Sequence, residues 1–204
     1  MRMASYGQTV SRLQPVIKPI FDALDAGLEA AAADHARRDL QRPDDPWYFA
    51  HSARRTVCDK LRAAGLQAVD EDTGRPVNPM SGLLVTYGGI ALKILRPTID
   101  RRGRVVLPIP GPSVKRQQFW GQQPALDLAG VPTDNIIVLW HDKDGVLVEP
   151  LTLFRPLGGS HRQDSLQLDW RGTLERSMAT MRVADLELLP AAAEFPSLGE
   201  QRLG

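Results

Sequence analysis

The sequence has little cysteine and histidine. Cys58 is the single cysteine among 204 residues, which excludes a disulfide within the chain and fits a reducing cytoplasm. It stands among apolar residues of a predicted helix, so we expect a buried thiol and not a nucleophile. The four histidines are scattered without the spacing of metal ligands, and zinc binding is not expected.

Long apolar runs and an excess of charge are missing as well. No run approaches the roughly 18 residues of a membrane span, and the N-terminal stretch lacks the apolar core of a signal peptide. We therefore expect a cytoplasmic protein that does not enter a membrane. The net charge is +1, which favours no class of partner. Basic residues are mostly arginine, as in proteins from GC-rich bacterial genomes.

Signatures of catalysis and nucleotide binding are also missing. The chain has no Gly-x-Ser-x-Gly elbow, no Gly-x-Gly-x-x-Gly loop and no Walker lysine. Asp142-Lys143-Asp144-Gly145 resembles part of a calcium loop, but the closing glutamate is missing and a hairpin turn explains it better. We expect no catalytic residue, no metal and no cofactor.

The N-terminal region has the hydrophobic period of a helix. Apolar residues recur every three or four positions over residues 8–40. Pro15 and Pro19 interrupt this pattern, so the firm helix is predicted to begin near Pro19 and to end near Arg38. Its apolar stripe must pack on the domain or on a second chain. We assign it as a partner-binding surface, represented by Ile17, Phe21, Leu24 and Leu28.

The remaining pattern predicts an α+β fold. Asp45 and Pro46 begin a second helix that ends at Gly65. Gly88-Gly89 joins the strands LLVTY and IALKIL into a tight hairpin, expected to be central and covered on both faces. A short edge strand follows, then a short helix capped by Ser113. The strand IIVLW comes next, and an Asp-Gly turn returns the chain as VLVEPLTLFRP.

Three regions are expected. Residues 1–43 form an N-terminal helical region, residues 44–158 form the α+β core, and residues 159–204 form a C-terminal extension with a loose tail. Within that extension, LQLDW and MRVADLELL are predicted as further edge segments of the sheet.

The segment between Lys93 and Gln123 is the strongest candidate for a ligand surface. It has seven basic residues against one acid, Asp100, together with glutamines and two aromatic residues. Lysine and arginine bind phosphates, glutamine reads base edges, and an aromatic ring stacks on a base. The alternative is a solvated basic loop and a helix anchored in the core by Phe119 and Trp120. The predicted ligand-binding residues are Arg101, Arg102, Arg104, Lys115, Arg116, Gln117 and Trp120.

The order of elements over residues 47–155 resembles the core of the restriction-endonuclease-like fold, the PD-(D/E)XK superfamily. That family holds a divalent metal with acids on one strand and an acid-x-Lys on the next. In this sequence the second hairpin strand reads Ala91-Leu92-Lys93, so the lysine is present and the acid is not. LLVTY offers no acid either. The resemblance implies a site without metal, in a non-cleaving relative.

The sequence therefore predicts a non-enzymatic bacterial binding or regulatory protein that contacts nucleic acid or a protein partner through residues 93–123. Two alternatives stay open. One is a nuclease-like enzyme in which Asp70, Glu71, Asp72 or Asp100 works with Lys93. The other is an assembly component of a phage or mobile element, which self-associates through its N-terminal helix.

Overall fold

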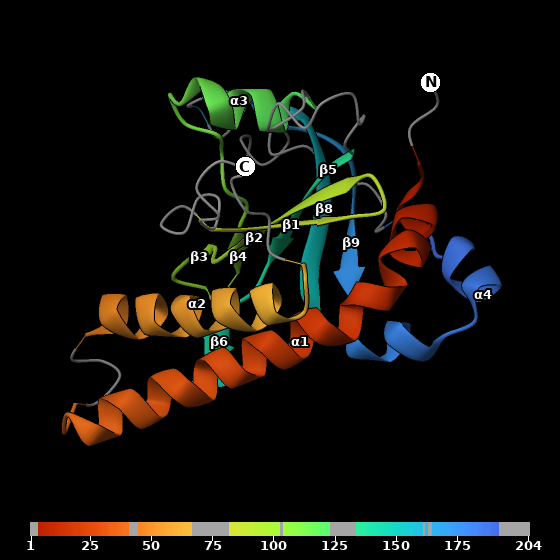
Figure 1. Cartoon of the computed structure of the whole chain (residues 1–204). Helices are drawn as coiled ribbons and strands as arrows, with labels where there is room; N and C mark the ends of the chain where they lie inside the picture. Colours follow the sequence, from red (N-terminus) through yellow and green to blue (C-terminus); the bar gives the residue numbers. More distant parts are fainter. Residues whose placement is uncertain are drawn as a thin grey trace.

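The protein is described by a computed structural model that covers residues 4–40, 45–66, 82–102, 104–122, 134–160, 162 and 165–191. Two long helices precede a five-stranded sheet, and shorter elements follow or interrupt it (Figure 1). The α+β class predicted from the sequence is confirmed. The helices are α1 (Tyr6–Arg37), α2 (Pro46–Ala63), α3 (Val114–Trp120), the 3₁₀ helix η2 (Arg176–Thr180) and α4 (Val183–Glu187).

The central sheet has the strand order β1-β2-β5-β8-β9. Its strands are β1 (Leu83–Tyr87), β2 (Ile90–Leu95), β5 (Asp134–Leu139), β8 (Leu151–Gly158) and β9 (Gln167–Leu174). Only the β2–β5 pair is parallel, and the other neighbours are antiparallel. Two small ribbons lie outside this sheet: β3 (Thr98–Ile99) pairs with β4 (Val105–Val106), and β6 (Asp142–Lys143) pairs with β7 (Val146–Leu147).

Two glycines form the tight turn between β1 and β2, at the position that the sequence predicts. Gly88 and Gly89 both have positive φ angles, +55° and +77°, as a two-residue type I′ turn requires. The hairpin is confirmed, and both of its faces are covered. It is not central, because β1 forms one edge of the sheet. The Asp144-Gly145 turn also has two positive φ angles, but it joins only the short β6 and β7, and β8 is the strand that returns along β5.

The sheet separates two apolar layers. One face packs against α1 and α2 through residues such as Val85, Leu92 and Val138. The opposite face carries the alternate residues Leu84 and Ile137 and packs against α3. Figure 1 shows α1 and α2 on one side of the sheet and α3 on the other. This three-layer arrangement buries a strand on both faces, as the near-continuous apolar runs of β2 and β5 require.

The first helix begins earlier than predicted. It starts at Tyr6, behind the N-cap Ser5, and continues through Pro15 and Pro19. The prediction of a start near Pro19 was wrong because buried residues on both sides of the prolines hold the helix against the core, among them Leu13 and Ile20. Figure 1 shows α1 bending between its red and orange parts, the usual effect of proline inside a helix.

The C-terminal segments differ in part from their prediction. LQLDW lies in β9, which forms the second edge of the sheet, as expected. MRVADLELL is not a strand, because it contains the short helix α4. One apolar cluster runs from Tyr6 in α1 through the sheet to Leu186 in α4. This cluster crosses the predicted boundaries at residues 43 and 158.

Candidate functional site

The predicted ligand surface belongs to two elements on one side of the sheet. Arg101 and Arg102 lie in the turn between β3 and β4, and Lys115 and Arg116 lie on α3; all four side chains are exposed. Val105 of β4 packs against the same apolar cluster as α3. β4 and α3 therefore pack on the same face of the sheet.

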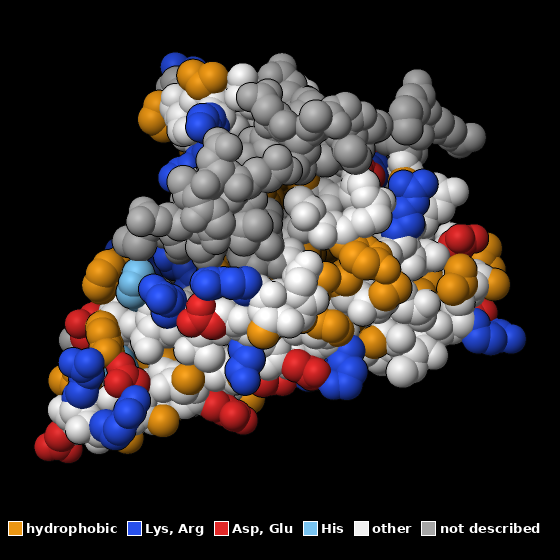
Figure 2. Space-filling model, in the orientation of Figure 1, with side chains coloured by type: hydrophobic (Ala, Val, Ile, Leu, Met, Phe, Trp, Pro, Cys, Tyr) orange, Lys and Arg blue, Asp and Glu red, His pale blue; other side chains and the backbone are white. Residues whose placement is uncertain are grey.

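Arg101, Arg102, Lys115 and Arg116 together form the basic surface of the protein. Among the described residues, no carboxylate forms an ion pair with any of them. Arginines on the outer faces of α1 and α2 differ: Arg37 and Arg38 pair with Asp34, and Arg55 and Arg62 pair with Asp59. In Figure 2 no coloured acidic side chain lies beside the basic side chains over α3, whereas the two signs alternate along α1 and α2.

Arg104 behaves differently from its neighbours. Its Nε donates to Asp100 Oδ2 at 2.8 Å. Asp100 also accepts from the backbone N–H groups of Arg104 and Arg102. These hydrogen bonds, the Arg104 backbone bond foremost, lower the pKa of Asp100 below its usual value. Arg104 thus stabilises the β3–β4 turn, and it is less free to bind a ligand than the sequence suggested.

The glutamines divide between surface and interior. Gln117 is exposed and donates to the carbonyl of Gly111 at 3.0 Å. Gln122 instead donates to the carbonyls of Asn135 and Pro156 and accepts from the Asn135 N–H, which fixes the end of α3 on the sheet. Gln123 lies outside the described residues.

Trp120 is not available to a ligand. Its side chain is 1% exposed, and it forms an apolar cluster with Phe119, Ile137 and Phe154. The assignment of Trp120 as a base-stacking residue was wrong, and the alternative of a core anchor is confirmed. The reason is the shortness of α3: seven residues offer one inner face, and Phe119 and Trp120 occupy its last turn.

The stripe assigned to a partner is also inside the chain. Ile17, Phe21, Leu24 and Leu28 are each at most 1% exposed and belong to the main apolar cluster. The structure corrects their assignment as a partner-binding surface, because the hydrophobic face of α1 packs on this chain's own sheet and α2. A second copy is not needed to cover it.

Lys93 lies beneath the basic surface. It belongs to β2, is 7% exposed, and points to the α3 side of the sheet, where its Nζ lies 5.7 Å from the centre of the Phe119 ring. Burial, and then the nearby positive charge of Arg116, lower the pKa of Lys93 to about 8. Among the described residues no carboxylate pairs with its amine. The acids Asp70, Glu71 and Asp72 lie outside those residues.

Sequence reasoning missed a buried arginine network. Arg155 is fully buried in β8 and ion-pairs with Asp134 and Asp169, the latter at 2.7 Å. Its guanidinium also donates to the carbonyl of Ala4 and to Thr9 Oγ1. An arginine inside the apolar run of a predicted strand was the available signal, because such a charge must find acidic partners.

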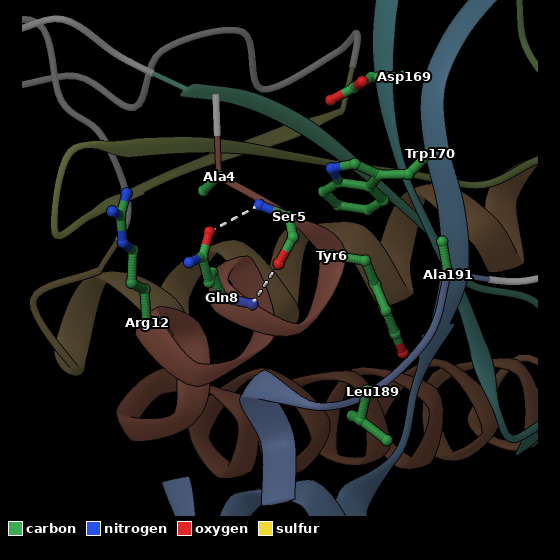
Figure 3. A pocket seen from close by; sticks show the side chains of 9 residues that line it. All are labelled: Ala4, Ser5, Tyr6, Gln8, Arg12, Asp169, Trp170, Leu189 and Ala191. Atoms are coloured by element: carbon green, nitrogen blue, oxygen red, sulfur yellow. Dashed lines mark hydrogen bonds between the residues drawn. The ribbon is translucent and has the colours of Figure 1, made fainter. Parts of the chain in front are cut away.

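A hollow of about 810 Å³ adjoins this network (Figure 3). The first turns of α1, strand β9 and the segment after α4 form its walls. Figure 3 shows Arg12 and Asp169 on two sides of it, with the rings of Tyr6 and Trp170 next to each other. These rings meet edge to face, with centroids 5.5 Å apart. The lining residues are Ala4, Ser5, Tyr6, Gln8, Arg12, Asp169, Trp170, Leu189 and Ala191.

A smaller pocket, about 190 Å³ in volume, lies where the parallel strands β2 and β5 end. Arg54, Arg96 and Trp140 line it. Arg96 donates to the buried Asp142 at 2.8 Å. Burial lowers the pKa of the neighbouring His141, and Asp142 partly opposes this effect.

The structure supplies no metal centre among its described residues, since no three histidine, cysteine or acidic side chains converge there. Within the same residues, none of the helices is long and apolar enough to cross a bilayer. No family model, curated protein or solved structure matches this chain.

Proposed function

We propose that this chain is a binding protein for nucleic acid, which it contacts through the phosphate backbone. The observation that carries the proposal is the basic surface: Arg101 and Arg102 in the β3–β4 turn and Lys115 and Arg116 on α3 are exposed and, among the described residues, unpaired. Lysine and arginine side chains of this kind bind phosphates, and neutralisation of the phosphates releases counterions from the nucleic acid.

The buried aromatic residues narrow the mode of binding. Since Phe119 and Trp120 are core residues, no aromatic side chain of α3 is left to stack on a base. Gln117 and Gln118 are the exposed glutamines of α3 that remain for contact with base edges. Phosphate contacts set affinity and register but carry little sequence information. We therefore expect binding with weak sequence preference and strong salt dependence.

The test is fluorescence anisotropy with random duplex and single-stranded DNA over a salt series. The variant Lys115→Ala/Arg116→Ala is expected to bind more weakly at every salt concentration. Its salt slope, the change in log K with log salt, should fall by about two, one for each lost phosphate contact. Arg101→Ala/Arg102→Ala should give a similar loss.

A matched control is Lys18→Ala/Arg37→Ala, which removes the same charge from exposed, ion-paired sites on α1. This control is expected to keep the wild-type slope. Equal weakening of all three variants would mean that net charge alone matters. Wild-type affinity in both test variants would show that the basic surface is not the interface.

A second candidate is a nuclease-like enzyme that uses Lys93. In its favour, Lys93 is buried in β2, and the parallel neighbour of this strand, β5, follows α3 in the chain. A cleavage assay with Mg²⁺ or Mn²⁺ tests it. Cleavage that disappears in Lys93→Ala supports the enzyme, and cleavage that persists in this variant argues against a role for Lys93.

A further inference from the structure

The hollow between the start of α1 and strand β9 has the size of a small-molecule site, with a volume of about 810 Å³. Ser5, Gln8 and Arg12 line it from one face of α1, because positions three and four apart in a helix lie on the same side. Asp169 and Trp170 line it from β9. Figure 3 shows Arg12 and Asp169 on two sides of the hollow.

The α1 side of the hollow carries hydrogen-bond donors and a positive charge. Arg12 is exposed and forms no ion pair with any described residue. The Oε1 of Gln8 accepts from the backbone N–H of Ser5 at 2.9 Å, and the NH₂ group of Gln8 has no acceptor among the described residues. A guanidinium and an amide NH₂ group are both donors to a carboxylate.

The β9 side carries a surplus negative charge. Asp169 Oδ2 accepts from Arg155 Nη1 at 2.7 Å, and Asp169 Oδ1 has no donor among the described residues. The same guanidinium pairs with Asp134, so two carboxylates share one cation. Asp169 is the more exposed of the two, at 32% against 16% of the side chain, and it lines the hollow. An ammonium group is a strong partner for such a carboxylate.

Trp170 adds a polar atom that the fold leaves without a partner. The residue is 7% exposed, and its indole Nε1 is closed off from solvent without a hydrogen-bond acceptor among the described residues. Figure 3 shows this nitrogen on the edge of the ring that is directed away from β9 and toward the start of α1. Buried N–H groups are nearly always hydrogen-bonded, so an unpaired one in the wall of a hollow indicates a polar ligand group as its acceptor.

We propose that the hollow binds a small zwitterion, an ω-amino acid whose carboxylate is bound by Arg12 and whose ammonium is bound by Asp169. Opposite charges on two sides of the hollow favour a ligand that carries one charge of each sign. Because the two charges come from separate elements, an alkyl chain must separate the charges of the ligand. This chain packs on the rings of Tyr6 and Trp170, and the carboxylate offers the acceptor that the indole N–H lacks.

This site lies outside the basic surface, and it does not depend on the proposed binding of nucleic acid. The Arg12 side chain belongs to the first turns of α1, whereas the basic surface lies on α3 and the β3–β4 turn. Loss of one kind of binding is therefore expected to leave the other unchanged.

The test is a titration of the full chain, labelled with ¹⁵N-tryptophan, with 6-aminohexanoate, followed by NMR of the indole N–H signals. The four tryptophans give one indole signal each, and Trp170→Phe identifies the signal of Trp170. This signal is expected to shift to saturation, while those of Trp47, Trp120 and Trp140 stay in place. The homologues 4-aminobutanoate and 8-aminooctanoate determine the best chain length. No saturable shift at Trp170 with any of the three would overturn the proposal.

Analogues with a single charge show whether both charges are recognised. Hexylamine lacks the carboxylate of 6-aminohexanoate, and hexanoate lacks its ammonium. The zwitterion of best length is expected to bind at least about tenfold more tightly than either of its single-charge analogues, because each loses a charged hydrogen bond. Equal affinity for the acid would mean an anion site, and equal affinity for the amine would mean a cation site. Either result would overturn the zwitterion proposal.

Two variants assign the charges to their residues. Arg12→Gln is expected to abolish the preference for the zwitterion over the amine, and Asp169→Asn the preference over the acid. Arg37→Gln, an exposed arginine at the far end of α1 that pairs with Asp34, is the matched control and should keep both preferences. Asp169→Asn also loses a partner of Arg155, so its folding is checked by circular dichroism. Arg12 is exposed, and an Arg12→Gln protein that keeps the wild-type preference over the amine would contradict the proposal by itself.

Discussion

Arg155 shows how one residue can connect distant parts of the chain. Its guanidinium binds Asp134 at the start of β5, Asp169 in β9, and Ala4 and Thr9 at the start of α1. It also lies 5.1 Å from the centre of the Trp170 ring. The network therefore fixes the N-terminus of α1 to one end of the sheet.

Removal of Arg155 is expected to destabilise the protein strongly. Arg155→Ala leaves two carboxylates and a backbone carbonyl without their partner, and breaking a buried pair in this way costs about 3–5 kcal/mol. Chemical unfolding measures the loss. Arg182→Ala, which breaks the exposed pair with Asp185, is the control and should cost less than about 1 kcal/mol. Equal losses would mean that the Arg155 network contributes no more than a surface pair.

The lowered pKa of Lys93 predicts that the stability of the protein depends on pH. Its pKa is about 8 in the fold against 10.5 in the unfolded chain. Between these values the unfolded chain binds more protons, so the stability of the wild type rises with pH there. Below pH 8 the full cost of the buried charge is present. Lys93→Met removes that cost and should stabilise the protein at pH 7 by on the order of 1–3 kcal/mol.

The gain in free energy of unfolding from Lys93→Met should shrink as the pH approaches 10, where the wild-type amine is neutral in the fold. Chemical unfolding at pH 7 and pH 10 measures both values. Lys60→Met, on the exposed face of α2, is the control and should show no such trend. A constant difference between Lys93→Met and wild type across this range would contradict a lowered pKa in the fold.

At the scale of elements, α1 is held by what it packs against more than by its own sequence. Pro15 and Pro19 each remove a helical hydrogen bond, yet the helix runs unbroken from Tyr6 to Arg37. Its contacts with α2, η2 and α4 are extensive. Packing of an amphipathic face contributes more to a helix in a protein than local propensity does.

Gly27 lies where α1 and α2 approach each other closely. A Cβ at this position would lie 2.5 Å from Val57 Cγ2 and 2.7 Å from the carbonyl oxygen of Ala53. In an isolated helix, Gly→Ala stabilises by about 1 kcal/mol. Here the clash outweighs that gain, and Gly27→Ala is expected to destabilise the protein by about 1–3 kcal/mol.

Thermal or chemical unfolding shows whether Gly27→Ala lowers or raises the stability of the protein. Adding Val57→Ala to Gly27→Ala should recover part of the loss that Gly27→Ala causes, because it removes the nearer of the two contacts. A stabilised Gly27→Ala would mean that the two helices separate at no cost.

At the scale of the whole molecule, the helices and the sheet share one core. α1 supplies buried residues from Tyr6 to Ala31, and β9 supplies the fifth strand together with Trp170 and Leu174. Removal of an element that covers the sheet would expose the apolar face of the sheet to water.

Fragments cut at the predicted boundaries are therefore expected not to fold. Residues 44–204 lack α1, and residues 1–158 lack β9 and α4. Circular dichroism with urea unfolding should show a cooperative transition for the full chain and none for either fragment. A cooperative transition in residues 44–204 would establish the N-terminal region as a separate unit.

Interactions between neighbouring residues determined several local features of this protein. Ser5 and Asp45 cap helices through their own side chains, and the Gly88-Gly89 pair dictates a tight hairpin, because these effects act over a few neighbouring residues. The exposed cations of the basic surface were likewise visible in the sequence. Their lack of acidic partners among the described residues was not, since pairing depends on residues that approach only in the fold.

The tertiary structure decided which apolar residues face inward and which polar groups meet. Leu24 and Trp120 could have packed against a partner or in this chain's own core. The hydrophobic effect is non-directional, so a sequence pattern does not reveal which surface an apolar residue packs against. Strand order placed Lys93 under α3 and joined Arg155 to acids 14 and 21 residues away. The sequence by itself determined the helix caps, the tight hairpin and the charges, whereas the extent of α1 and the candidate sites arose from contacts between elements that the chain brings together only on folding.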